Sequence, residues 1–326
     1  MTNDGLRWGV LGAGGIAKEQ VRDMKLHGFD VVAVAARDLG KARAWADEMG
    51  VPTAYGSYEE LAADPGVDAI YVATVHPAHA ESARIALEGG KHVLVEKPFT
   101  MDAGEARELV DLAASRGLVI LEAMWTRWLP HMVRIREILA EGLLGDVRVV
   151  LADHDQSNEH VERMYKPELG GGALLDLGIY PVSFAWDVLG PHDSVLASAT
   201  LTDAGVDRET AVILGYPSGA HAVLQTQMSG TGPNRAAIVG TEGRIEIESV
   251  WYNVVGFTRY DKAGEIVERF DEEVEGRGMH FQAAELERIV ASGRLEGDIL
   301  PPSETVAIME TLDEVRRQIG LEYPKR

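Results

Sequence analysis

Three side chains, in two separate segments, have the types needed to move a proton. Lys97 lies in the run Glu96-Lys97-Pro98 at the end of an apolar stretch, and Asp176 and Tyr180 stand four residues apart in an apolar segment led by three glycines. At that spacing Asp176 and Tyr180 share one face of a helix. An ammonium group beside a phenol favours phenolate, so Lys97 and Tyr180 are suited to acid/base chemistry at an alcohol or carbonyl. The alternatives are a surface ion pair for Lys97 and a packed core tyrosine for Tyr180.

A glycine turn near the N-terminus has the spacing of a phosphate-binding loop. Gly12-x-Gly14-x-x-Ala17 follows a predicted buried strand and opens a predicted helix. Gly12 permits the tight turn, Gly14 lets the backbone approach a pyrophosphate, and Ala17 allows helix and strand to pack closely. N–H groups at the start of the helix then hold the phosphates. In this context the pattern predicts a bound NAD or NADP.

The end of the second strand bears on the choice between these two nucleotides. NAD enzymes usually carry an acidic residue there for the ribose 2′-hydroxyl, but this chain has Ala36 followed by Arg37. The Arg37 guanidinium is suited to a 2′-phosphate, and Lys41 adds a second positive charge. The sequence therefore favours NADP, with NAD bound through Asp38 as the alternative.

The elements that must position these residues fall into two patterns. Residues 6–122 alternate apolar runs with helical segments, which predicts a doubly wound parallel sheet of the Rossmann type. Ser57 with Glu60, and Asp102 with Glu105, have the spacing of helix N-caps. The predicted strands of this half are 6–11, 31–36, 69–75, 92–95 and 119–121.

After residue 123 the pattern changes to β-type runs separated by short turns, which predicts an α+β domain with a large, mostly antiparallel open sheet. The predicted strands are 147–152, 194–201, 209–215, 221–227, 236–239 and 244–247. The predicted helices are 130–141, 173–188, 281–290 and 303–319. We therefore expect a dinucleotide-binding domain over 1–123 and a substrate-binding and dimerisation domain over 124–326, whose last helix could pack back on the first domain.

The composition excludes several functions. The chain has 326 residues, no cysteine and a formal net charge of −21, so thiol chemistry is ruled out and neither nucleic acid nor anionic membrane is an expected partner. We expect no signal peptide, no membrane span and a cytoplasmic location. Asp153-His154-Asp155 with His160 could suggest a metal, but side chains that alternate along a strand do not converge, so no metal site is expected.

Taken in order along the chain, the glycine turn, Glu96-Lys97-Pro98 and the segment from Gly170 to Tyr180 resemble the glucose–fructose oxidoreductase/inositol dehydrogenase (Gfo/Idh/MocA) family. The runs His76-Pro77-x-His79 and Glu122-Ala123-Met124-Trp125-Thr126-Arg127 are similar to its dihydrodiol dehydrogenase branch, which is also active as an NADP-dependent D-xylose 1-dehydrogenase. The resemblance implies hydride transfer between NADP and a carbinol or hemiacetal carbon, and a homodimer or higher homo-oligomer formed through the second-domain sheet.

The resemblance also implies site residues. Lys97, Tyr180 and Asp176 would be catalytic. The cofactor would be bound by Gly12, Ala13, Gly14, Gly15, Ile16, Ala17, Arg37, Asp38, Lys41, Thr74, His76, Glu96 and Lys97. The substrate would be contacted by His79, Trp125, Arg127, His154, Asp176 and Tyr180.

Some positions depart from the family pattern. Lys41 stands where the relatives carry Arg, and His154 and Met279 stand where the dihydrodiol enzymes have aromatic residues. These departures favour a small polyol or aldose over an aromatic diol. The rival interpretation is a non-catalytic NAD(P)-dependent sensor on the same fold, which the presence of both Lys97 and Tyr180 disfavours.

Overall fold

The computed structural model describes residues 5–324, which form two compact units. The first comprises the described residues up to Trp125 together with Gly276–Val306, and the second comprises Thr126–Glu275 with the described residues from Ala307 onward. The sequence placed everything after residue 123 in the second domain. Residues 276–306 instead belong to the first unit, where the carboxylate of Glu287 accepts a hydrogen bond from Nε1 of Trp8 at 2.8 Å.

The first unit is built on a six-stranded parallel sheet in the order β3-β2-β1-β4-β5-β6. Its strands are β1 (Arg7–Leu11), β2 (Asp30–Ala35), β3 (Thr53–Tyr55), β4 (Ala69–Val72), β5 (His92–Glu96) and β6 (Ile120–Ala123). The strand order reverses between β1 and β4. In open sheets of this kind ligands bind beyond the carboxyl ends of the strands at such a reversal.

The crossovers between these strands are helical, as the alternation in the sequence predicted. The helices are α1 (Gly15–Leu26), α2 (Leu39–Met49), α3 (Tyr58–Ala62), α4 (His79–Glu88), α5 (Ala103–Arg116) and, from the later segment, α8 (His280–Ala291), with a short 3₁₀ turn, η1 (His76–Ala78). Both predicted caps are present, because Ser57 accepts from the Glu60 N–H at 3.2 Å and Asp102 from the Glu105 N–H at 2.9 Å. Strand β3 and helix α2 are additional to the predicted elements.

The second unit is built on an eight-stranded sheet in the order β14-β13-β12-β11-β7-β10-β9-β8. Its strands are β7 (Val147–Asp155), β8 (Ser194–Leu201), β9 (Asp207–Gly215), β10 (His221–Gln227), β11 (Ala236–Gly240), β12 (Gly243–Ile247), β13 (Phe257–Asp261) and β14 (Ile266–Phe270). Neighbouring strands pair antiparallel except β7 and β10, which are parallel. The mostly antiparallel prediction is confirmed, and β13 and β14 extend the sheet beyond the predicted strands.

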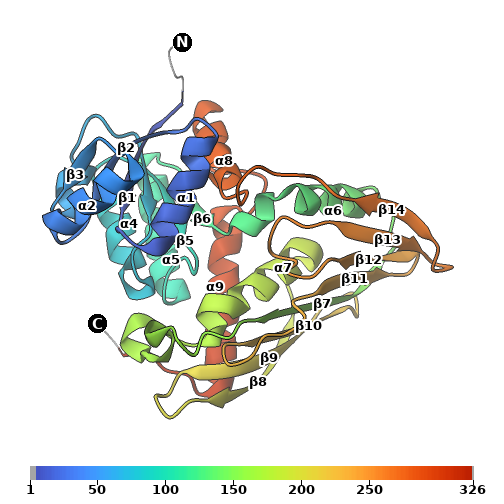
Figure 1. Ribbon diagram of the computed structural model, residues 1–326. Helices are drawn as coiled ribbons and strands as arrows, with labels where there is room; N and C mark the ends of the chain where they lie inside the picture. The colour runs from blue at the N-terminus through green and yellow to red at the C-terminus, as the bar shows by residue number, and fades with distance from the viewer. Residues whose placement is uncertain (1–4, 325–326) are drawn as a thin grey trace. The chain divides into compact units, whose positions relative to one another are not determined.

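Helices cover one face of this sheet. They are α6 (Pro130–Ala140), α7 (Ile179–Leu189) and α9 (Pro302–Ile319), with short helical turns η2 (Trp125–Trp128), η3 (Glu162–Tyr165), η4 (Pro167–Leu169) and η5 (Leu174–Gly178). Helix α7 lies along the middle strands (Figure 1). On β10 the residues that face the helices, such as Ala222 and Leu224, are buried, whereas Val223 between them is exposed. The other face of the sheet is therefore open within this chain.

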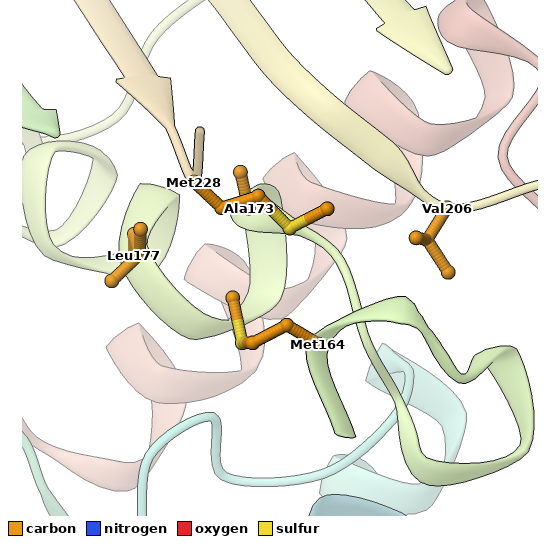
Figure 2. Packing of buried hydrophobic residues seen from close by; sticks show 5 residues of the cluster. All are labelled: Met164, Ala173, Leu177, Val206 and Met228. Atoms are coloured by element: carbon orange, nitrogen blue, oxygen red, sulfur yellow. The ribbon is translucent and has the colours of Figure 1, made fainter. Parts of the chain in front are cut away.

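A compact apolar cluster fixes the start of the segment that contains α7. Figure 2 shows its five residues, Met164, Ala173, Leu177, Val206 and Met228. All five are buried, and they come from η3, the start of the helical segment, the turn before β9 and the end of β10. Burial of this kind stabilises a helix start that local propensity alone would leave weak.

One segment among the described residues has the length and hydropathy of a membrane span. Residues Pro167–Leu189 reach a mean hydropathy of 1.2, but 78% of that window is buried inside the structure. An apolar helix packed on all sides is typical of a protein core.

Candidate active site

The glycine turn at the carboxyl end of β1 requires glycine at its first position. Gly12 has a φ of +107°, and a Cβ there would lie 2.5 Å from the carbonyl oxygen of Ala73. Its N–H donates to the carbonyl of Ala35 at 3.0 Å, which joins the turn to the end of β2. The turn therefore binds the ends of β1, β2 and β4 together at the edge where the strand order reverses.

The next two glycines leave room for a ligand. A Cβ on Gly14 or Gly15 would meet no atom within 4 Å, and Gly14 immediately precedes the first turn of α1. The buried Ala17 brings the helix close to the sheet. These backbone groups fit a pyrophosphate at a helix N-terminus. Ile16, predicted as a cofactor-binding residue, is 37% exposed at the start of α1.

The residues after β2 were predicted to bind the nucleotide ribose, and the structure gives them different roles. Asp38 is the N-cap of α2, because its Oδ1 accepts the Lys41 N–H at 2.7 Å. Arg37 and the side chain of Lys41 are exposed beside this turn. The positive charge of Arg37 acts on the phenol of Tyr58, whose pKa burial raises. With Asp38 engaged as a cap, the two cations are the groups best suited to a ribose substituent at this position.

The end of β4 and the loop after β5 are joined by a buried histidine. His79 contacts the carbonyl of Pro98 through Nδ1 at 2.8 Å and that of Thr74 through Nε2 at 3.1 Å. Burial, followed by the nearby charge of His76, lowers the pKa of His79 to about 3, so the ring is neutral. His76 meets it edge-on at 5.7 Å. His79 thus positions the loop that carries Lys97, and its predicted contact with the substrate stays a prediction.

Glu96 likewise organises the end of β5. It accepts from the phenol of Tyr71 on β4 and from the N–H of Lys97 at 3.1 Å. The Lys97–Pro98 peptide bond is cis. Lys97 is therefore held at the same edge of the sheet as the glycine turn, beyond the carboxyl end of β5, which β4 separates from β1.

Trp125 ends the first unit and is buried beneath Arg277, whose guanidinium carbon lies 5.6 Å from the indole centroid. Asp23 on α1 fixes the returning segment, because it accepts the N–H of Arg277 at 2.9 Å and of Met279 at 2.7 Å. Gly276 is required next to it, since a Cβ there would lie 2.3 Å from Oδ1 of Asp23. No pattern in the sequence indicated this contact.

In the second unit a buried carboxylate caps the segment that carries Asp176 and Tyr180. Asp207 accepts from the N–H of Leu174 and the hydroxyl of Thr210, both at 2.7 Å. Burial raises the pKa of Asp207 to about 6. Gly172, with a φ of +108°, lets this carboxylate approach, because a Cβ there would lie 2.2 Å from its Oδ1.

The helical segment itself begins with a π turn, η5, rather than the continuous α-helix that the sequence predicted from 173 to 188. Asp176 lies inside this wider turn, so the α-helical argument for one shared face with Tyr180 does not apply there. Asp176 accepts from Arg163 at 3.0 Å. Arg163 is half-exposed and was not among the predicted site residues.

Tyr180 lies among other rings. His154, at the end of β7, meets it edge-on with centroids 4.8 Å apart, and Tyr252 lies 5.6 Å away. All three rings are buried. Tyr252 was missed because it lies in a loop between β12 and β13 whose sequence carries no motif.

Arg127 is held by contacts with α7, and its predicted role as a substrate ligand stays a prediction. It is buried, donates to the Ser183 hydroxyl at 2.9 Å and carbonyl at 2.8 Å, and pairs with Asp187 at 3.0 Å. Ser183 and Asp187 lie on α7. Arg127 therefore fixes the helix that carries Tyr180.

The acidic run at the end of β7 makes hydrogen bonds to the backbone next to β11. Asp153 accepts the N–H groups of Asn234 at 2.6 Å and Arg235 at 3.0 Å. Among residues 5–324, no group of three His, Asp or Glu side chains is arranged to hold a metal ion.

The first unit thus has the glycine turn, strand order and helix N-terminus of a dinucleotide-binding oxidoreductase domain. Residues 6–123 match the model of the oxidoreductase family with an NAD-binding Rossmann fold (GFO/IDH/MocA), and residues 132–246 match the GFO/IDH/MocA C-terminal domain. The chain belongs to this family, as its motifs indicated.

Curated relatives extend over the whole chain. It is 37% identical to trans-1,2-dihydrobenzene-1,2-diol dehydrogenase of Mus musculus over 328 residues, with 98% of each chain covered, and 36% identical to the Homo sapiens enzyme, again with 98% of each covered. A 3-ketoreductase from Actinomadura kijaniata, solved with NADP and TDP-benzene, has a TM-score of 0.86 at 26% identity, covering 97% of this chain and 98% of its own. An aldose-aldose oxidoreductase from Caulobacter crescentus shares the fold, with a TM-score of 0.86 at 22% identity over 96% and 97% of the two chains.

Proposed function

We propose that this protein catalyses reversible hydride transfer between NADP and the carbinol or hemiacetal carbon of a small polyol, aldose or vicinal diol. The observation that carries the proposal is the edge of the first sheet, where the glycine turn and Lys97 lie beyond the carboxyl ends of β1 and β5. A cation at that edge is suited to a reacting oxygen, since ligands bind at this side of the sheet.

The proposed cofactor is supported by the groups that would hold it. The backbone of Gly14 and Gly15 fits the pyrophosphate, and Arg37 with Lys41 fits a 2′-phosphate. The names of the solved ketoreductase complexes include NADP. When bound, the nicotinamide ring takes the hydride that leaves the carbinol carbon.

The protein's own part in the reaction is the proton. In the oxidation direction Tyr180 takes the proton of the substrate hydroxyl as the carbon–oxygen double bond forms, and the Lys97 ammonium stabilises the phenolate form of Tyr180. Asp176, fixed by Arg163, orients a second substrate hydroxyl. In the reverse direction Tyr180 gives the proton back to the carbonyl oxygen, so the same groups serve reduction.

The test is a screen of aldoses, inositols, dihydrodiols and simple vicinal diols with NADP and NAD. Turnover is measured by the absorbance of the reduced nicotinamide. We expect turnover with at least one polyol or sugar and a preference for NADP. Saturable nucleotide binding without turnover on any of these substrates would contradict the proposal and favour a sensor.

We also propose a homodimer formed through the open face of the eight-stranded sheet. Four apolar side chains on adjacent strands form a continuous row there: Leu196, Ile213, Val223 and Leu151, which are 66, 41, 43 and 42% exposed. A second copy related by a two-fold axis would bury such a row against itself. Water-exposed apolar patches of this kind mark interaction surfaces.

A further inference from the structure

A polar cluster lies beside Tyr180, and the proposed proton transfer does not use it; of its members His154, Tyr252 and Gln156, only His154 was among the predicted site residues. The ring of His154 stacks on that of Tyr252, with centroids 3.8 Å apart and planes 27° apart. Gln156, two residues beyond His154, places its amide nitrogen 2.8 Å from Nε2 of His154 and 3.4 Å from the hydroxyl of Tyr252. One histidine ring thus stacks on Tyr252 and meets Tyr180 edge-on, and the two tyrosine rings lie 5.6 Å apart.

The position of Tyr252 is fixed by its neighbour in the chain. Trp251 donates from Nε1 to the carbonyl of Asp153 at 2.8 Å, and its own carbonyl lies 3.1 Å from Nε2 of His131. Its ring packs on Phe184 of α7 at 5.0 Å and meets Tyr252 at 5.7 Å. The loop between β12 and β13 is therefore anchored both to β7 and to the helix that carries Tyr180.

The hydrogen bonds define which groups donate. An amide nitrogen carries two N–H groups and accepts nothing, so Nε2 of His154 and the oxygen of Tyr252 both accept from Gln156. The neutral ring of His154 then carries its proton on Nδ1. The O–H of Tyr252 points away from Gln156, which leaves this phenol as a hydrogen-bond donor on the side of the cluster that Gln156 does not occupy.

Simple packing does not account for this arrangement. A phenylalanine would fill the same space without the cost of burying a hydroxyl, which is considerable unless the hydroxyl has a partner. Burial also raises the pKa of Tyr252, so it keeps its proton at neutral pH. A protonated, anchored phenol beside the proposed acid/base group is suited to recognising an oxygen of the substrate.

We propose that Tyr252 is a specificity-determining residue that donates a hydrogen bond to the hydroxyl next to the one being oxidised, with His154 and Gln156 as the residues that position it. The substrates so favoured are vicinal diols, as in sugars and cyclic polyols, over isolated alcohols. The proposal rests on the proposed function insofar as Tyr180 acts at the reacting carbon.

The test compares substrates that differ by one hydroxyl, cyclohexane-1,2-diol with cyclohexanol and an aldose with its 2-deoxy analogue. Tyr252→Phe should lower kcat/KM for the diol about tenfold, mostly through KM, and leave the mono-alcohol nearly unchanged, because a recognised hydroxyl is bound in ground and transition states alike. Gln156→Glu offers only acceptors, so it draws the Tyr252 proton to itself and should cause a similar loss. The matched control is Tyr216→Phe, which changes another buried tyrosine of the same unit. It should leave the kcat/KM of the diol relative to the mono-alcohol, and of the aldose relative to its 2-deoxy analogue, unchanged.

Calorimetric titration of each compound in the presence of NADP separates the two proposals. A wild type that turns over none of these substrates contradicts the proposed function, whereas a diol affinity that Tyr252→Phe weakens still supports the role of Tyr252. Thermal unfolding establishes that each variant is folded. If Tyr252→Phe does not fold, Gln156→Glu tests the same proposal. An unchanged preference for the diol in folded Tyr252→Phe or Gln156→Glu would overturn the inference.

Discussion

At the scale of single residues, the site depends on a few charges set in an acidic protein. Arg37 follows a strand end whose nearest carboxylate, Asp38, is engaged as the cap of α2. A positive charge that faces solvent beside the nucleotide site discriminates between a ribose hydroxyl and a phosphate, because only the phosphate carries charge there.

The first prediction concerns Arg37. Arg37→Ala should weaken NADP binding by roughly 1–3 kcal/mol, the range for a charge-assisted hydrogen bond, and leave NAD almost unchanged. Calorimetry with both nucleotides measures this difference. Arg43→Ala, an equally exposed arginine on α2, is the control and should affect neither. Equal losses for NADP and NAD in the Arg37 variant would remove it from the 2′-phosphate site.

The second prediction concerns the proton-transfer pair. Tyr180→Phe keeps the ring that packs against His154 and should lower turnover by about 10²- to 10⁴-fold. Lys97→Met should have a similar effect, and the double variant should lose far less than the product, because the groups act as a unit. Single-turnover hydride transfer at the wild-type rate in folded Tyr180→Phe would instead assign this ring a packing role.

Local chemistry made some of these residues predictable and others not. Gly12, Ser57 and Asp102 obey rules of backbone conformation and capping that act over three or four residues, so spacing alone located them. Tyr252 lies near Tyr180, and Gln156 near Tyr252, only through the fold of a sheet whose strands are far apart in the sequence, and no local pattern encodes these contacts. The ion pair of Arg127 with Asp187, 60 positions later, is likewise not encoded in the motif of Arg127.

At the scale of elements, the segment from Gly170 to Leu189 shows how a strained start is maintained. The left-handed φ of Gly172 brings Asp207 against the first N–H groups of the helical segment, and the π turn η5 follows. The sequence predicted the helix from its apolar run but not the π turn, because the carboxylate that caps it comes from β9. The position of Asp176 therefore depends on a contact between separate elements.

The third prediction follows from the pKa of Asp207, which burial raises to about 6 from its ordinary value of 3.8. The folded state favours the protonated carboxyl, so its contribution to stability is complete below pH 3.8 and is lost as the pH rises towards 6. Asp207→Asn cannot titrate. The free energy of unfolding of the wild type relative to this variant should therefore fall by roughly 1–3 kcal/mol between those pH values and stay level above them.

Urea unfolding across this pH range measures the difference. Asp68→Asn is the control of opposite sign, because the hydrogen bond from Arg7 lowers the pKa of Asp68 and its contribution is present at higher pH and lost as the pH falls. A constant offset between wild type and Asp207→Asn at every pH would show that the carboxyl has no shifted pKa.

At the scale of the whole molecule, the two sheets differ in how they are covered. The parallel sheet of the first unit has helical crossovers between its strands, as its nearly continuous buried runs predicted. The sheet of the second unit alternates buried and exposed residues along β9 and β10, because helices pack on one face only. That alternation could be predicted from the sequence, whereas what packs on the open face could not, because the pattern of one strand does not show which surface covers it.

The fourth prediction tests the proposed homodimer. Ile213→Asp and Val223→Lys place charges at neighbouring positions in the middle of the exposed apolar row, where β9 pairs with β10. If two copies bury this row, either charge would be desolvated against apolar side chains, so light scattering at micromolar concentration should show the wild type as a dimer and both variants as monomers. Ile266→Asp, an equally exposed apolar residue on the edge strand β14, should remain dimeric. A monomeric wild type would exclude the assembly, and dissociation by Ile266→Asp alone would move the interface to the edge of the sheet.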